Sequence, residues 1–466
     1  MAQSIRELGV GQVQSELQKM SQSPGLPFRD LLSPERIQTA LENAGVKFRE
    51  RIYTPAITIW AFLSQILTPK GTCQTAVGRV LVDRLEAGLA PCSVETTSYC
   101  QARQRLPEAV ISGLATDMGK ELHDQAPVEW KLKGRDVVIA DGSTARMADT
   151  PENQAVYPQS RTQKPGLGSP LLRFVALLSF SVGTVLACAI GPCRGKKTGE
   201  QSLFREIRDQ LKSGTILLGD CLYDSYHDIA DLLAQGVDVV FGMKQSRKPD
   251  FRRGRKLGTE DHVVIWMKPK YDKSRFTSRA HWESLPESME IREARLHVTR
   301  KGYRTRIIMI VTTLLDAETY TKQDLMHLFQ QRWHCELDLR SIKCGLGMKD
   351  LKCETPEMVR KELWMHLLAY NSLRVRMAQA AALHNVQPRQ LSFQSALAFH
   401  QEFMPALQRA NAEDQSRLER EMLKAMAQCK VGDRPGRKEP RAVKKRVQKY
   451  VHLTKPRVEA RKGLKA

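Results

Sequence analysis

The hydrophobic and polar positions of this chain change their spacing near Asp136. Between residues 33 and 123, apolar positions follow helical spacing, and polar residues that cap helices, such as Ser33 and Thr54, precede them. From Asp136 on, short apolar runs typical of buried strands alternate with helical segments. The pattern predicts a helical N-terminal domain at 1–130, followed by an α/β domain.

The α/β domain is expected to contain one mixed sheet. Strands are predicted at 137–140, 174–180, 185–190, 215–219, 237–241 and 306–312, and helices at 199–211, 228–235, 325–343 and 356–382. The order of these elements predicts a sheet domain at 131–350 with an insertion at about 244–305. A helical region at 351–429 and a tail at 430–466 complete the predicted organisation.

The uncharged run 174–190 is long enough to require a membrane test. It carries no charge over 17 residues, which is the lower limit for a spanning helix. Polar and small residues interrupt its middle, where Ser179, Ser181 and Gly183 separate two β-rich runs. A buried hairpin is therefore favoured over a membrane span, and no membrane partner is expected.

Charge narrows the class of partner. The chain has 73 Lys and Arg against 51 Asp and Glu, a net charge of +22, which indicates a polyanionic partner and most simply a nucleic acid. Ribosomal or membrane-surface binding would also fit the charge alone. Half of the excess lies in 430–466, where 14 cations face three acids. This tail is expected to be a mobile basic arm, with a solvated terminus as the alternative.

Cysteine usage and the N-terminus give weaker constraints. The ten cysteines include no CxxC pair, and the even spacing of Cys335, Cys344 and Cys353 matches no zinc pattern. Reduced, mostly structural thiols are expected. The N-terminus lacks a basic start followed by an apolar core, so no secretory signal is expected and the cytoplasm is the default location.

The predicted helix at 325–343 places one acid among cations. At about 100° per residue, four side chains fall within an arc of about 60°: Phe329, Arg332, Glu336 and Lys343. An acid between two cations suits a site that holds both a metal ion and a phosphate. The alternative is a surface helix with an ordinary Arg-to-Glu pair at i,i+4. His334 and Cys335 project away from this face, so packing roles are expected for them.

Two aspartates follow apolar runs of strand type. Asp141 follows 137–140 and Asp220 follows 215–219, so neighbouring strands would bring both carboxylates to one sheet edge. Either aspartate alone is more typical of a turn or a helix N-cap. Together with Glu336 they supply three carboxylates, which suit two divalent ions about 3.5–4 Å apart in phosphodiester chemistry.

Three blocks in order resemble a known family. They are Asp141-Gly-Ser-Thr, Leu218-Gly-Asp220-Cys-Leu-Tyr223-Asp-Ser, and Arg332-x3-Glu336-x6-Lys343. Over roughly 136–382 the chain resembles the DDE transposases of the insertion-sequence-four group. In that group the third block begins with Tyr, where this chain has Phe329. A single block would be weak, whereas the joint match is specific.

The resemblance implies an RNase-H-like catalytic core with a β-rich insertion between Asp220 and Glu336. It also implies that Asp141, Asp220 and Glu336 form the catalytic triad and hold two Mg²⁺ ions, for which Mn²⁺ can substitute. Arg332, Lys343 and position 329 would contact DNA phosphates. Phe329 lacks the hydroxyl that Tyr would offer a phosphate but keeps the ring.

Relatives of this kind cut DNA at both transposon ends, often through a hairpin intermediate, and join the 3′ ends to target DNA. The expected partners are therefore double-stranded DNA, as inverted-repeat ends and target, and a second copy of the chain in a homodimer. The expected location becomes the bacterial cytoplasm, with the nucleoid. Some relatives hold a flipped base on an aromatic of the insertion, where this chain offers Trp266 and Trp282, although core packing is equally compatible.

Two other functions remain open from the sequence. One is a non-catalytic DNA-binding protein derived from a transposase, and the other is a structure-specific nuclease that cuts without joining. The presence of all three acids with Arg332 and Lys343 argues against the first. The sequence does not separate the second from a transposase.

Overall fold

A computed structural model describes residues 27–46, 51–272, 278–297, 307–432, 451 and 453–462. Most of the tail that was expected to be a mobile arm, namely residues 433–450, 452 and 463–466, lies outside the described residues. The strands are β1 (Val137–Arg146), β2 (Leu171–Ser179), β3 (Val185–Pro192), β4 (Ile216–Gly219), β5 (Asp238–Gly242), β6 (Arg255–Gly258), β7 (Asp261–Met267), β8 (Ser288–His297) and β9 (Ile307–Thr312).

The helices divide into groups before, within and after the strands. The α-helices before β1 are α2 (Pro34–Asn43), α3 (Pro55–Leu67), α4 (Cys73–Glu86), α5 (Thr97–Arg105) and α6 (Glu108–Asp124). Between strands lie α7 (Pro151–Val156), α8 (Glu200–Ile207), α9 (Tyr226–Ala234) and α10 (Arg279–Ser284). After β9 come α11 (Lys322–Gln331), α12 (Trp333–Arg340), α13 (Pro356–Leu383), α14 (Phe393–Arg409), α15 (Ala412–Gln428) and α16 (Arg457–Lys462).

All nine strands named above form one mixed sheet in the order β3-β2-β1-β4-β5-β9-β8-β7-β6. β1 pairs antiparallel with β2 and parallel with β4, and β5 is parallel to β4. The order β3-β2-β1-β4-β5 is that of an RNase-H-like core, which confirms the predicted fold class. The hairpin expected at 174–190 is also confirmed, because β2 and β3 pair antiparallel. No described helix is long and apolar enough to cross a membrane.

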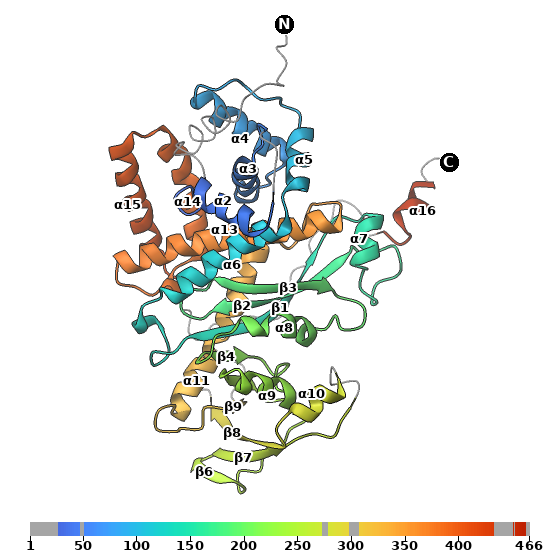
Figure 1. Ribbon diagram of the computed structural model, residues 1–466, viewed down its shortest axis with the longest axis vertical. Helices are drawn as coiled ribbons and strands as arrows, with labels where there is room; N and C mark the ends of the chain where they lie inside the picture. The colour runs from blue at the N-terminus through green and yellow to red at the C-terminus, as the bar shows by residue number, and fades with distance from the viewer. Residues whose placement is uncertain are drawn as a thin grey trace.

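The insertion extends the core sheet. β9 returns antiparallel to β5, and β8, β7 and β6 follow it outward. In Figure 1 these strands lie at one end of the molecule, and helices α2–α6 and α13–α15 lie at the other. The residues between β5 and the third acid therefore build a long sheet that flanks the core.

The two faces of the sheet are covered by different helices. Val137 and Ile139 of β1 belong to the core shared with α6, α12 and α13, and Val138 and Ala140 belong to the core shared with α8 and α9. This is the alternation expected of a strand buried on both faces. The N-terminal helices join the first of these cores, so helices before and after the sheet pack together.

Helix α13 is the central element of that packing. It runs for 28 residues and buries most of its circumference, which suits a helix surrounded by others. Its Asn371 accepts a hydrogen bond from the Val185 N–H and donates to the carbonyls of Val185 and Ala115. Gly119 of α6 lies so close to β3 that a Cβ there would stand 2.1 Å from the Val185 oxygen. These contacts fix α6 and α13 against β3.

Candidate functional site

Asp141 and Asp220 lie side by side at the centre of the sheet. β1 and β4 pair in parallel through Val137–Ile216 to Ile139–Leu218, so the same register places Asp141 beside Asp220 two residues later. The prediction that Asp220 follows its strand is confirmed, because β4 ends at Gly219. For Asp141 it was wrong. β1 continues to Arg146, because β2 stays paired with it as far as Leu171.

Each aspartate is oriented by a backbone amide. The Gly142 N–H donates to Asp141 Oδ1 at 2.9 Å, and the Leu222 N–H donates to Asp220 Oδ1 at 2.7 Å. Burial raises the pKa of Asp141, and the neighbouring Asp220 charge raises it further, while the Gly142 N–H and Arg332 lower it. Two fixed carboxylates this near each other favour a cation between them.

The helix expected at 325–343 is broken at Arg332. α11 ends at Gln331, Arg332 links it to α12, and the Cys335 N–H bonds the Arg332 carbonyl three residues back. A π-helical turn follows at Ser341–Gly345. The single helix expected at 325–343 is thus divided into α11, α12 and a π-helical turn that contains Lys343. The contacts of Arg332 with Phe329 and with Glu336 keep these three side chains on one side of the segment.

The side chains of helix α12 differ in their contacts with the aspartates. α12 packs against β1, and the buried Cys335 thiol hydrogen-bonds Asp141, which lowers the pKa of that carboxyl. Glu336 points elsewhere, with its side chain 49% exposed and its Oε1 at 3.3 Å from Arg332 Nη2. Among the described residues, no three His, Cys, Asp or Glu side chains are grouped closely enough to hold a metal ion. The structure thus brings Asp141 and Asp220 together and leaves Glu336 on the adjacent helix, paired with Arg332.

The remaining predicted residues lie around the same aspartates. Lys343 Nζ donates to Ser143 Oγ at 2.9 Å, two residues beyond Asp141 on β1, and burial lowers the pKa of Lys343. The tip of the Phe329 ring lies against the backbone of Gly242, where a Cβ would stand 3.3 Å from Phe329 Cζ. The Arg332 guanidinium is 6.0 Å from the centre of that ring. All of these cations and rings therefore surround one end of β1 and β4.

A buried ion pair network holds α12 in place. Asp338, two residues after Glu336, receives hydrogen bonds from Arg374 of α13 and from Arg389, and all three side chains are nine-tenths or more buried. Arg389 also donates to the carbonyls of Ser179 and Phe180 at the end of β2. The network therefore connects α12 to the sheet and to the central helix.

Three residues near the aspartates had not been considered as site residues. Glu200 begins α8, and Tyr223 donates its hydroxyl to Glu200 Oε1 at 2.9 Å. Trp333 stands beside Arg332 with 51% of its surface exposed. Glu200 resembles any acid in the first turn of a helix, so no local sequence pattern marked it. An exposed large aromatic next to Arg332 could only be recognised once the helix was placed.

The two tryptophans of the insertion are engaged in its packing. The Trp266 indole N–H donates to Glu293, and Arg247 stacks at 3.6 Å from its ring centre. The Trp282 N–H donates to the Pro269 carbonyl, and Lys268 lies 4.4 Å from its ring centre. Each indole thus has its N–H bonded and a cation against its ring.

Most cations of the N-terminal helices have structural contacts. Arg84 and Arg103 are buried, Arg103 between the rings of Phe62 and Tyr99, and Arg79 pairs with Asp83 at 3.1 Å. Arg105 differs from these three cations. Together with Arg51 it lines a pocket of about 390 Å³.

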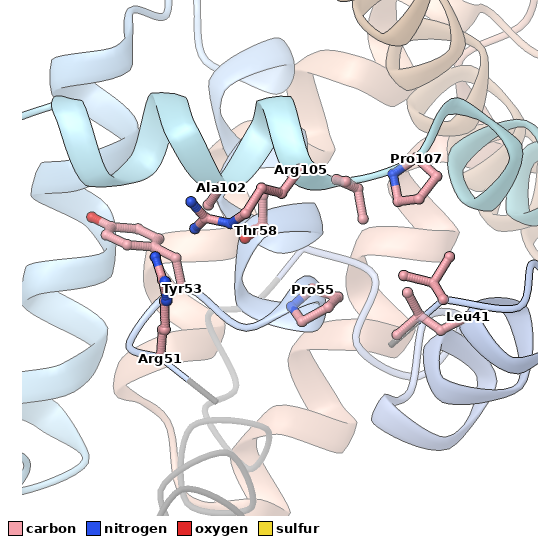
Figure 2. A pocket seen from close by; sticks show the side chains of 10 residues that line it. Leu41, Arg51, Tyr53, Pro55, Thr58, Ala102, Arg105 and Pro107 are labelled. Carbon is pink, nitrogen blue, oxygen red and sulfur yellow. The ribbon is translucent and has the colours of Figure 1, made fainter. Parts of the chain in front are cut away.

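Figure 2 shows this pocket, with Arg51 and Arg105 converging at one end, and Leu41 and Pro107 at the other. Burial lowers the pKa of Arg105, and the Arg51 charge lowers it further. No acidic residue lines the pocket, and within the described ranges neither arginine has an ion pair. Two like charges converging without an acid make this an anion-attracting site.

Comparison with known proteins finds transposases. A family model described as "Transposase DDE domain" matches residues 132–372. The chain is 29% identical over 434 residues to the transposase InsG for insertion sequence element IS4 of Escherichia coli K12, covering 92% of this chain and 94% of that protein. A solved structure, the piggyBac transposase synaptic complex with hairpin DNA, is 12% identical with a TM-score of 0.40, covering 86% of this chain and 82% of that one.

Proposed function

Because this chain belongs to the DDE transposases of the IS4 group, we propose that it performs cut-and-paste transposition with Asp141, Asp220 and Glu336 as its catalytic carboxylates. The observation that carries this assignment is the parallel register of β1 and β4, which sets Asp141 beside Asp220. Glu336 lies on the helix that packs against β1. Hydrolysis frees the 3′ ends of the element, and strand transfer joins them to target DNA.

Transposases of this family use divalent metal ions, and we assign two Mg²⁺ ions, replaceable by Mn²⁺, to the three carboxylates. Carboxylate oxygens are the hard donors that Mg²⁺ prefers. One oxygen of Asp141 and one of Asp220 accept backbone N–H groups, which orients both groups. Bound ions would activate the attacking oxygen and stabilise the leaving oxygen. Glu336 would join the aspartates by giving up its contact with Arg332. That contact is 3.3 Å long, and the Glu336 side chain is 49% exposed.

Arg332 and Lys343 are assigned to the DNA phosphates next to the cut. Released from Glu336, the Arg332 guanidinium can bind a phosphate through two N–H groups, whereas Lys343 offers a point charge. Ser143 holds Lys343 Nζ two residues from Asp141. Phe329 supports Arg332 through its ring face and lines the same end of the sheet. The four residues would thus hold a strand end against the carboxylates.

DNA is the partner of this family, and we assign a homodimer on paired inverted-repeat ends, since both ends must be cut in concert. The net charge of +22 supports a long duplex contact. The pocket of Arg51 and Arg105 would supply a further phosphate contact in the helical N-terminal region. The helices at 1–130 would then bind the end sequence while the sheet performs the chemistry.

Cleavage of labelled transposon ends in Mg²⁺ tests the assignment. Asp220→Ala is expected to abolish nicking with an unchanged circular dichroism spectrum, because one of two adjacent metal-binding carboxylates is lost. Asp209→Ala is the matched control, since the Asp209 side chain is 84% exposed. Nicking by Asp220→Ala at the wild-type rate would refute the assignment. A plasmid-joining assay separates transposition from cutting alone.

A further inference from the structure

Glu200 approaches the aspartates from the opposite face of the sheet to Glu336. It is the first residue of α8, which packs on β2 and β3 within the core that also contains α9. A Cβ added to Gly142 would lie 2.5 Å from Glu200 Cδ and 2.6 Å from its Oε2. The carboxylate therefore rests directly on the backbone next to Asp141, in space that only a glycine leaves open.

Tyr223, in the segment that follows Asp220, holds Glu200 in position. Tyr223, three residues after Asp220 and 1% exposed, donates its hydroxyl to Glu200 Oε1 at 2.9 Å. The other oxygen, Oε2, has no hydrogen-bond partner in the part of the chain that the structure describes, and it is the one nearest Gly142. One oxygen is thus fixed by the Asp220 loop, and the second is left free beside Asp141.

Strand β4 ends just before Asp220, whereas β1 continues. The last pair of the ladder between β1 and β4 is Ile139–Leu218, and β4 ends at Gly219. Glu200 lies within electrostatic reach of both aspartates. Burial raises the pKa of Glu200 and the charges of Asp141 and Asp220 raise it further, while the Tyr223 hydroxyl and the charge of Arg173 lower it.

Glu200 forms no salt bridge among the described residues, and it adds a third negative charge near the two aspartates. Carboxylates within electrostatic reach repel one another unless cations lie among them. Arg332 beside Asp141 and Arg173 near Glu200 offset part of this repulsion. A divalent cation bound among the carboxylates would offset the rest.

We infer that Glu200 is a fourth carboxylate of the active site, a ligand for one of the divalent cations on the side of Asp141 opposite to Glu336, with Tyr223 as its positioning residue. This inference rests on the proposed function. The ligand class is a hard divalent cation with oxygen donors. Glu336 would then serve the other ion, so the two ions would be held from the two faces of the sheet.

Binding of Mn²⁺ to the full-length protein tests the inference without relying on activity. Electron paramagnetic resonance of free Mn²⁺ would be recorded for the wild type, Glu200→Gln and Tyr223→Phe. Glu200→Gln is expected to weaken one Mn²⁺ site by about tenfold or more, as losses around metal sites commonly do. Tyr223→Phe, which keeps the ring, is expected to weaken the same site less. Glu206→Gln is the matched control, because Glu206 is exposed on the same helix.

The outcomes distinguish this inference from the proposed function. Wild-type Mn²⁺ binding by Glu200→Gln, with binding lost in Asp220→Asn, would overturn the inference and leave the function standing. Unchanged binding in Asp141→Asn and Asp220→Asn would instead overturn the metal assignment of the function itself. If Glu200→Gln fails to fold by circular dichroism, Glu200→Asp replaces it, because it keeps the charge and withdraws it from Gly142. Wild-type binding by a folded Glu200→Asp would then overturn the inference.

Discussion

Lys343 contacts Ser143, two residues beyond Asp141 on β1, although 200 residues separate Lys343 from Ser143 in the sequence. Its ammonium group is half-buried, and burial lowers its pKa, so the charge is held in place at a cost in solvation. A phosphate oxygen near Ser143 would restore that solvation. A phosphate contact therefore explains the half-buried position of the Lys343 ammonium group, which a surface ion pair would not.

Lys343→Met keeps the aliphatic stem and removes the charge. We expect nicking of transposon ends to fall by roughly 10–100-fold, since a hydrogen bond to a charged group contributes about 1.5–3 kcal/mol. Thermal unfolding should be little changed, because Lys343 has no acidic partner within the described ranges. Single-turnover nicking assays would measure the loss, with Lys349→Met as the exposed control. Equal rates for the two variants would contradict the phosphate role.

Phe329 is the position at which the chain departs from the pattern of its family. The tip of its ring, where a tyrosine would carry its hydroxyl, faces the backbone at Gly242, close to Asp220. The ring also lies beneath the Arg332 guanidinium. Packing of the ring is therefore retained without the hydroxyl, and Arg332 keeps its aromatic support.

At the scale of elements, the short helix α12 is the most constrained part of the site. It carries Cys335 against Asp141 and Glu336 toward Arg332, and both directions depend on where the helix is fixed. Asp338 fixes it, because its carboxylate is fully buried between Arg374 and Arg389. A rotation of this helix would move the cysteine, the glutamate and the aspartate contact together.

Asp338→Asn leaves two buried guanidinium groups without their anion. Breaking a buried pair in this way costs about 3–5 kcal/mol of unfolding free energy, and urea unfolding would measure it. Asp350→Asn is the matched control, since its pair with Arg146 is exposed on both sides, and such surface pairs contribute about 0–1 kcal/mol. Equal destabilisation by the two substitutions would show that the buried network does not anchor α12.

At the scale of the whole molecule, the helical region and the sheet share one hydrophobic core around α13. The pocket of Arg51 and Arg105 lies among the N-terminal helices, which pack together with α13 (Figure 1). A duplex end that contacts both this pocket and the carboxylates would be positioned by the helical region as well as by the sheet.

The double substitution Arg51→Ala with Arg105→Ala tests this path. Affinity for end DNA should fall, and the slope of log affinity against log salt should decrease by about 1–2, since each neutralised phosphate contributes roughly 0.9. Nicking at saturating DNA should persist, because the carboxylates are untouched. Fluorescence anisotropy over a salt series would measure the slope, with Arg417→Ala as an exposed control on α15. An unchanged slope would remove the pocket from the DNA path.

The sequence by itself determined the order of strands and helices and the mixed sheet with its insertion, because these depend on local periodicity. Short motifs proposed Asp141, Asp220 and Glu336 as the three acids, and the net charge indicated a DNA partner, because it needs no coordinates. Only the tertiary structure decided how the acids are presented. The predicted single helix is divided at Arg332 and ends in a π-turn at Ser341–Gly345, and α12 packs against β1. Glu200 is joined to Asp141 and Asp220 by strand pairing and by the space at Gly142, and contacts between distant segments leave no periodic trace in the chain.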